Sequence, residues 1–271
     1  MSLVSTEWLE NNMNNLKILD CSWHMPSLNR DSYNEYVSEH IQNAIFFDLD
    51  KNSDQNTDLP HMLASKENWE KIVSEMGLNN DDNIVVYDNS DVISSCRCWY
   101  NFIYFGHNPN LVHVLDGGLK KWIEEGKFTT DKITQTNFSR YIAKENKELV
   151  KNKLQIDNNI LNKNFIVIDA RSKDRFEGKA KEPRKGLRSG SIPSSFCIPF
   201  NELINNDHSF KSTNELADIF KKTLGNNMSL NVVFSCGSGV TASVLALAYS
   251  LINNKYMPVI YDGSWAEYGR S

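Results

Sequence analysis

Residues 231–242 read Asn231-Val-Val-Phe-Ser-Cys-Gly-Ser-Gly-Val-Thr-Ala242, and this stretch decides the fold. An apolar segment typical of a buried strand runs into a glycine-bearing loop and then into a helical pattern over residues 242–252. Cys236 ends the strand, at the edge of an open α/β sheet where ligands bind. The stretch therefore predicts an α/β domain with a site at this loop.

The glycines around Cys236 indicate an anion cradle. Gly237 and Gly239 are free to adopt left-handed conformations, which would turn the N–H groups of the loop, including those of Val240 and Thr241, toward the sulfur. The positive end of the following helix adds to this field. A reactive cysteine needs such surroundings because the thiolate is the nucleophile. A buried, inert Cys236 is the alternative, and the glycines and the helix disfavour it.

A phosphatase loop has a similar layout, but it needs an arginine at its end to grip the phosphate oxygens. The residue six positions after Cys236 is Ala242. The loop can hold an anionic sulfur but lacks the side chain for a phosphate.

Four segments of the first half recur in the second half in the same order. They pair 16–21 with 165–171, 40–50 with 190–202, 83–88 with 231–236, and 112–119 with 258–266. The offset is 149 residues from Asp20 to Asp169 and 148 residues from Asp88 to Cys236. A nearly fixed offset indicates two copies of one structural unit.

Helical patterns alternate with these strands, at residues 69–76, 98–105, 215–224 and 242–252. Such alternation predicts an α/β fold with two tandem domains, each a mainly parallel sheet flanked by helices. A polar stretch separates the copies. We expect an N-terminal domain over 12–131, an interdomain linker over 132–160 and a C-terminal domain over 161–271.

Composition narrows the function classes. The 271 residues carry a net charge of −5 with no dense basic run, which disfavours nucleic acid as a partner. The sequence has no run of about 18 apolar residues, which a membrane-spanning helix would need. Residues 1–10 do not resemble a secretion signal, so we expect a cytoplasmic protein. The five cysteines are scattered, and we expect free thiols; apart from Cys236 we interpret them as ordinary thiols.

Three segments carry a family resemblance: CGSGVTA at 236–242, VIDARSKDRF at 167–176 and VIYDGSWAEYG at 259–269. Together with most of the chain they resemble the 3-mercaptopyruvate sulfurtransferases of the rhodanese superfamily. The resemblance implies tandem rhodanese domains of which only the second keeps the cysteine. Asp88 stands at the matching position of the first domain, which is therefore expected to be catalytically inactive. Ser191-Ile-Pro-Ser194 replaces a His-Ile-Pro-Gly turn common in the family, which leaves that turn's geometry open.

The resemblance also implies roles for the site residues. Cys236 matches the nucleophile, and Arg175 and Arg184 match the arginines that hold the carboxylate and carbonyl of mercaptopyruvate. A planar carboxylate suits a guanidinium fork, and contacts to the substrate oxygens also stabilise the departing enolate.

Three further residues match catalytic positions of the family. Ser238 matches a loop serine that forms a triad with a histidine and an aspartate of the first domain, here His61 and Asp50. Hydrogen bonding within this triad would assist proton transfer at the substrate thiol or the leaving enolate.

The implied activity is a ping-pong sulfur transfer with no metal and no organic cofactor. A small-molecule donor loads sulfur onto Cys236, and a thiol such as thioredoxin or a small thiol, or cyanide, accepts it. Thiosulfate:cyanide sulfurtransferase is an alternative, disfavoured because its members carry basic residues where this chain has Gly237 and Ser238. A non-catalytic persulfide relay is another, but it would need neither Arg175 nor Arg184.

Overall fold

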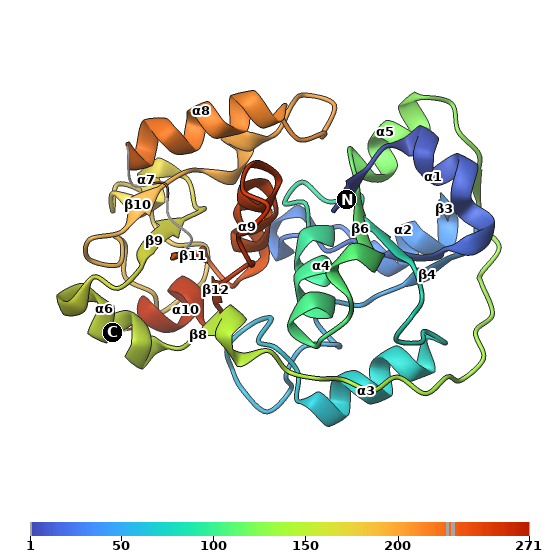
Figure 1. Ribbon diagram of the computed structural model, residues 1–271, viewed down its shortest axis with the longest axis horizontal. Helices are drawn as coiled ribbons and strands as arrows, with labels where there is room; N and C mark the ends of the chain where they lie inside the picture. The colour runs from blue at the N-terminus through green and yellow to red at the C-terminus, as the bar shows by residue number, and fades with distance from the viewer. Residues whose placement is uncertain (1, 226–227, 229–230, 271) are drawn as a thin grey trace. The chain divides into compact units, whose positions relative to one another are not determined.

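A computed structural model describes residues 2–225, 228 and 231–270 (Figure 1). The chain forms two compact units. Unit 1 comprises Met1–Gln55, Leu63–Asn146 and Asn206–Ser209, and unit 2 comprises Asn56–Met62, Lys147–Asn205 and Phe210–Ser271. The short segment Asn56–Met62, which includes His61, belongs to unit 2 although it lies in the first half of the sequence.

Unit 1 is built on a parallel sheet of five strands in the order β1-β6-β5-β2-β4. The strands are β1 (Leu3–Val4), β2 (Lys17–Asp20), β4 (Ala44–Phe46), β5 (Ile84–Tyr87) and β6 (Val112–Leu115). Its helices are α1 (Thr6–Asn12), α2 (Ser32–Ser38), α3 (Lys66–Glu75), α4 (Ser95–Tyr104) and α5 (Gly118–Glu124), with 3-10 turns at η1 (Met13–Asn15), η2 (Pro26–Leu28) and η3 (Pro109–Leu111). A short antiparallel pair joins β3 (His40–Ile41) to β7 (Thr129–Thr130).

Unit 2 has a second parallel sheet of five strands, in the order β10-β9-β11-β12-β8. The strands are β8 (Val150–Lys151), β9 (Ile166–Asp169), β10 (Phe196–Cys197), β11 (Val232–Ser235) and β12 (Ile260–Tyr261). The helices are α6 (Lys153–Asn162), α7 (Lys173–Phe176), α8 (Thr213–Leu224), α9 (Val240–Ile252) and α10 (Ser264–Tyr268), and the 3-10 turns are η4 (Lys147–Leu149) and η5 (Phe200–Leu203).

The internal repeat is present in the topology. Reading from β1 and from β8, the two sheets have the same strand order, with β2 equivalent to β9 and β5 equivalent to β11. The backbone bonds that follow these strands also correspond. The N–H of Cys21 donates to the carbonyl of Tyr87 at 2.8 Å, and the N–H of Ala170 donates to that of Ser235 at 2.8 Å. The predicted α/β fold with two tandem domains is confirmed.

The core of unit 2 explains why β11 and α9 form where they do. All four residues of β11 are buried, as a parallel strand covered on both faces requires. Most of α9 is buried too, and aromatic rings join it to α8 and the sheet: the ring centroids of Phe220 and Tyr249 lie 5.0 Å apart, and those of Phe234 and Tyr249 lie 5.9 Å apart. The strand that leads to Cys236 is therefore fixed by a rigid core.

The stretch expected as a linker, 132–160, differs from the structure in its second half. Residues 147–162 form η4, β8 and α6, and β8 pairs with β12 as the edge strand of the second sheet. Strand β8 has only two residues, and α6 buries only Ile156 and Asn159, so neither leaves a clear hydrophobic period in the sequence.

The turn at Ser191-Ile-Pro-Ser194 has a definite geometry. Ser194 has φ of 65°, in the left-handed region that favours glycine. The serine therefore adopts the conformation for which the glycine of a His-Ile-Pro-Gly turn is suited, at some cost in backbone strain.

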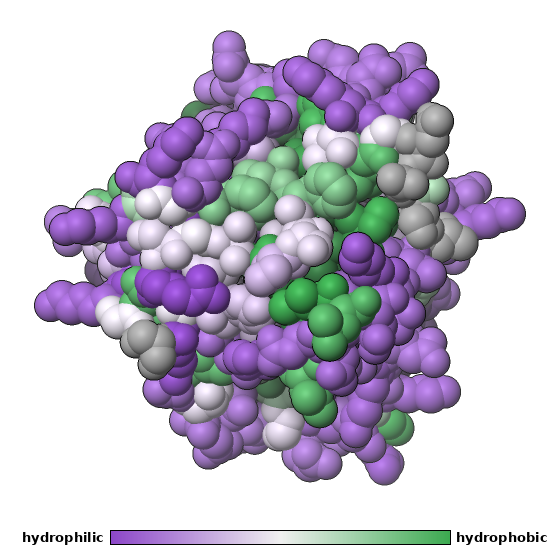
Figure 2. Space-filling model, turned by 90° about the vertical axis from the view of Figure 1, so that its left-hand side faces the viewer, coloured by the Kyte–Doolittle hydropathy of each residue, from purple (hydrophilic) through white to green (hydrophobic). Residues whose placement is uncertain are grey.

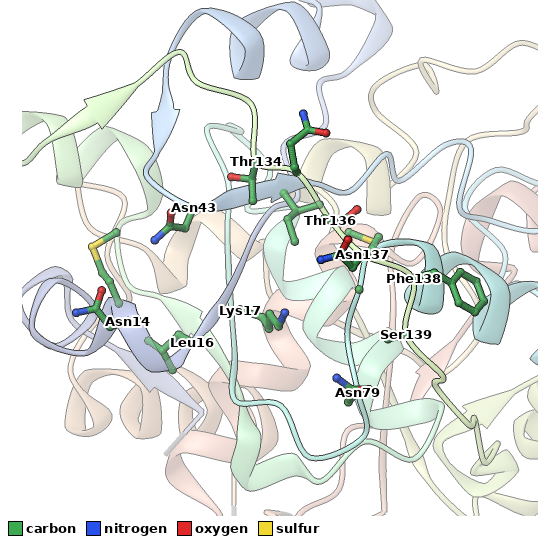
Figure 3. Close-up of a pocket in the computed structure, with 15 residues that line it drawn as sticks. Asn14, Leu16, Lys17, Asn43, Asn79, Thr134, Thr136, Asn137, Phe138 and Ser139 are labelled. Carbon is green, nitrogen blue, oxygen red and sulfur yellow. The ribbon is translucent and has the colours of Figure 1, made fainter.

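Unit 1 also contains a polar cavity of about 480 Å³ (Figure 3). Lys17, the first residue of β2, lines it together with asparagine, threonine and serine side chains from η1 and the 134–139 segment. None of the predicted site residues lines this cavity.

The molecular surface is mainly hydrophilic in the view of Figure 2, with some hydrophobic side chains among the polar ones. The exposed apolar residues of unit 2 include Leu154, Leu161 and Phe196. Such single exposed residues are ordinary on folded proteins. None of the helices formed by the described residues has the length and apolar character of a membrane-spanning segment.

Candidate active site

Cys236 lies at the carboxyl end of β11 and is 2% exposed. Its N–H donates to the hydroxyl of Ser264 at 3.1 Å, and its carbonyl accepts from the N–H of Trp265 at 2.9 Å. The N–H of Ala266 in turn donates to the carbonyl of Gly237 at 2.9 Å. The start of α10 therefore holds the cysteine loop by three hydrogen bonds.

Ser264 is a residue whose part in the site the sequence interpretation missed. It is fully buried and has φ of 49°, a left-handed conformation that is strained for serine. The equivalent residue of unit 1 is Gly118, with φ of 58°. The sequence contained a signal for the positive φ of Ser264, because the repeat aligns Asp262-Gly-Ser with Asp116-Gly-Gly. Glycine at this position in one copy indicates a positive φ in both.

The two loop glycines have different tasks. Gly239 has φ of 81° and is the N-cap of α9, as a glycine is suited to be. Gly237 is not in the left-handed region, contrary to expectation; a Cβ there would lie 3.4 Å from both Nη2 of Arg175 and Nη1 of Arg184. Gly237 therefore leaves room for two guanidinium groups beside the cysteine.

Helix α9 begins at Val240, two residues earlier than the pattern predicted. Val240 and Thr241 are thus the first turn of the helix, whose leading N–H groups have no partner within the helix. Among the described residues none accepts a hydrogen bond from the N–H of Gly237, Ser238 or Gly239. Together with the positive end of the helix, these donors favour an anion next to Cys236.

Two arginines of unit 2 approach this loop. Arg175, on α7, donates from Nε and Nη2 to the carboxylate of Glu182 at 3.2 and 2.6 Å. Arg184 donates from Nη2 to the hydroxyl of Ser238 at 3.3 Å. The structure thus brings both predicted substrate arginines to the cysteine loop.

A buried ion network lies behind Arg175. Arg171 donates to Asp169 at 2.7 Å and to Glu182 at 2.8 Å, and the side chains of all three are 2% exposed or less. Its guanidinium carbon also lies 4.2 Å from the ring centroid of Trp265. The sequence interpretation missed Glu182, although an acidic residue between Arg175 and Arg184 was a signal for it.

His61 and Ser238 lie in contact within unit 2. The Nδ1 of His61 is 2.9 Å from the hydroxyl oxygen of Ser238, and both residues are buried. Because Arg184 can only donate to that oxygen, the hydroxyl is free to donate its own proton to Nδ1. Asp50 lies in unit 1, where its carboxylate accepts from the indole N–H of Trp23 at 3.0 Å.

The other cysteines have different environments. Burial raises the pKa of the Cys21 and Cys96 thiols, and it raises the pKa of Cys197 to about 12. These thiols are therefore protonated at neutral pH and are poor nucleophiles.

A cavity of about 410 Å³ adjoins the cysteine loop. Arg184 and Ala266, which both contact the loop, line it together with Lys185, and Arg270 forms an ion pair with Asp58 at 2.9 Å at its edge. Within the described part of the chain no cluster of three or more His, Cys, Asp or Glu side chains could hold a metal ion.

Comparisons with known proteins agree with this geometry. The rhodanese-like domain matches residues 5–125 and 148–271. A mitochondrial thiosulfate/3-mercaptopyruvate sulfurtransferase of Arabidopsis thaliana is 40% identical over 98% of this chain and 75% of its own length. Rattus norvegicus thiosulfate sulfurtransferase is 35% identical over 99% of this chain and 92% of its own. The structure of the 3-mercaptopyruvate sulfotransferase SseA from Escherichia coli superposes with a TM-score of 0.86, at 31% identity, over 98% of this chain and all of that one.

Proposed function

The chain belongs to the rhodanese-like family and is a sulfurtransferase, and from this premise we propose that it takes sulfane sulfur from 3-mercaptopyruvate onto Cys236 and passes it to a thiol or to cyanide. The observation that carries the proposal is the approach of two guanidinium groups to Gly237, directly after the cysteine. A 2-oxo acid presents a carboxylate and a carbonyl, which suit two such groups.

In the first half-reaction the Cys236 thiolate attacks the sulfur of the bound donor. A sulfur–sulfur bond forms, the carbon–sulfur bond breaks, and its electron pair leaves on carbon as the enolate of pyruvate, which then takes up a proton. Arg175 and Arg184 stabilise the enolate oxygens, and the N–H groups of the loop hold the persulfide.

We assign proton transfer in this step to His61, Ser238 and Asp50. The hydrogen bond of 2.9 Å between His61 and Ser238 supports the first two assignments. A hydroxyl held between an imidazole and a guanidinium is suited to move a proton at the donor thiol or at the enolate.

In the second half-reaction an acceptor attacks the outer sulfur of the persulfide. A thiolate forms a new sulfur–sulfur bond, and the Cys236 thiolate leaves. Thioredoxin and small thiols both offer the required nucleophile, and cyanide yields thiocyanate in the same way. No metal or organic cofactor enters either half-reaction.

The main alternative donor is thiosulfate, which the names of the Arabidopsis and rat relatives include. Its negative oxygens lie next to the transferred sulfur, so it requires cations on the loop itself, where this chain has Gly237 and Ser238. A non-catalytic persulfide relay is disfavoured because it would not need two arginines at the loop.

A steady-state assay with both donors and cyanide tests the donor. We expect 3-mercaptopyruvate to be preferred by at least about 10-fold in kcat/KM, which corresponds to ~1.4 kcal/mol in the transition state. Ser238→Lys should shift the ratio toward thiosulfate. Equal or better use of thiosulfate by the unchanged protein would overturn the donor assignment but not the persulfide chemistry.

We further propose that the protein acts in the cytoplasm, a reducing compartment that suits its five free cysteines. The Arabidopsis relative is named as mitochondrial, so the location needs its own test. Immunostaining of the native protein should give a diffuse cytoplasmic signal, and enrichment in an organelle would contradict the proposal.

A further inference from the structure

We propose that Glu182 sets the charge selectivity of the site, favouring donors with one negative charge over dianions by neutralising Arg175. The inference rests on the proposed function, since it concerns how the same cysteine chooses its donor. Its basis is a buried carboxylate shared between two arginines, one of which extends to the cysteine loop.

The contacts of Arg175 with Glu182 offset its charge and orient its guanidinium group. The two carboxylate oxygens of Glu182 accept from Nε and Nη2 of Arg175 at 3.2 and 2.6 Å, a bidentate pair along one edge of the guanidinium. Nη2 also lies 3.4 Å from the position of a Cβ on Gly237. Glu182 thus occupies the Nε edge and leaves Nη1 and one N–H of Nη2 to the substrate.

Burial makes the charge of Glu182 effective at the loop. The side chain is 2% exposed, and that of Arg175 is 23% exposed, so water screens the pair poorly. Arg171 also donates to Glu182, but its own charge is matched by Asp169 at 2.7 Å. Glu182 is therefore the carboxylate that offsets the positive charge of Arg175.

The consequence differs between donors. Removal of the Glu182 charge would raise the local charge by one unit, and a dianion such as thiosulfate gains twice as much from that change as a monoanion does. The carboxylate of mercaptopyruvate carries a single charge. The ratio of kcat/KM values for the two donors therefore reports the charge of Glu182 directly.

The test compares Glu182→Gln with the matched control Glu177→Gln, whose carboxylate is 47% exposed and paired with Lys179. With cyanide as acceptor, the preference for mercaptopyruvate over thiosulfate should fall at least about 10-fold in the first variant. It should change less than about 2-fold in the control, as for an exposed ion pair. Glu182→Asp, which keeps the charge, should restore most of the preference.

Circular dichroism checks that each variant is folded. If Glu182→Gln is not, Glu182→Met removes the same charge without adding a buried amide and takes its place. An unchanged ratio, or an equal loss with both donors, would overturn the inference and leave Glu182 a purely structural residue. If the unchanged protein forms no persulfide on Cys236 from either donor, the proposed function itself fails.

Discussion

The two units place different acidic side chains at equivalent strand ends. In unit 1, β5 is followed by Asp88, whose carboxylate accepts from the N–H of Ser90 at 2.8 Å and from that of Ser95, the first residue of α4, at 2.9 Å. In unit 2, β11 is followed by Cys236, and among the described residues the N–H groups of the next three positions have no acceptor. The same topology makes an anion site twice, and in unit 1 the chain fills it with its own carboxylate.

The neighbouring strand ends differ in a similar way. The N–H of Ser22 donates to Asp20 at 2.9 Å, and the N–H of Arg171 donates to Asp169 at 2.9 Å, so the backbone geometry is the same. Arg171 adds a cation, which links Asp169 to Glu182 and so to the site. Asp20 has Ser22 in that place, and burial raises its pKa to about 6.

The largest expected effect on turnover separates Cys236 from Asp88, the residue at the equivalent position of unit 1. Cys236→Ser should abolish turnover while the fold survives, because a hydroxyl is a poorer nucleophile and cannot store sulfur. Asp88→Asn, the matched change in unit 1, should leave turnover nearly intact. Mass spectrometry after incubation with donor should show about +32 Da on the Cys236 peptide, the mass of one sulfur on a reactive thiolate. A label on Cys96 or Cys98 instead would contradict the assignment.

A smaller effect is expected from the arginines at the loop. Arg175→Ala or Arg184→Ala should lower kcat/KM for mercaptopyruvate by roughly 10- to 1000-fold, the scale of a lost charge-assisted contact. Transfer of the preformed persulfide to cyanide should continue nearly unchanged, because the carboxylate has left by then. Lys181→Ala, which removes an exposed cation of the same segment, serves as control. Equal losses in both half-reactions would show that the arginines support the fold.

The smallest effect concerns stability and sharpens the contrast between Asp20 and Asp169. Since the pKa of Asp20 is raised from 3.8 to about 6, the native state binds more protons than the unfolded state between these pH values. Asp20 therefore lowers the free energy of unfolding as pH rises through this window, and the loss is complete above it. Asp20→Asn should remove this penalty and stabilise the protein at pH 7 by about 1–3 kcal/mol.

Urea unfolding of both proteins at pH 4 and pH 7 measures this difference. The advantage of Asp20→Asn should be largest at pH 7 and fade toward pH 4, which lies close to the unfolded-state pKa of 3.8, so that little of the penalty remains there. An advantage independent of pH would mean that ionisation of Asp20 is not its cause.

Local patterns in the sequence determined the fold class and marked Cys236 as the candidate nucleophile. Strands alternating with helices, repeated at a nearly fixed offset, predicted two α/β domains, because periodicity and turn residues act over a few positions. The glycines after Cys236 marked the loop for the same reason. The short edge strand β8 escaped detection because two residues cannot show a period.

The family resemblance implied the pair His61 and Ser238, but no local pattern did, and the other contacts of the site came from the tertiary structure alone. His61 contacts Ser238 across 177 positions of sequence, and it does so because the short segment that carries it packs in unit 2. Glu182 and Ser264 likewise gained their roles from partners on other elements, Arg175 and Cys236. A hydrogen bond depends on where two segments lie after the core has packed, and no pattern within either segment records that position.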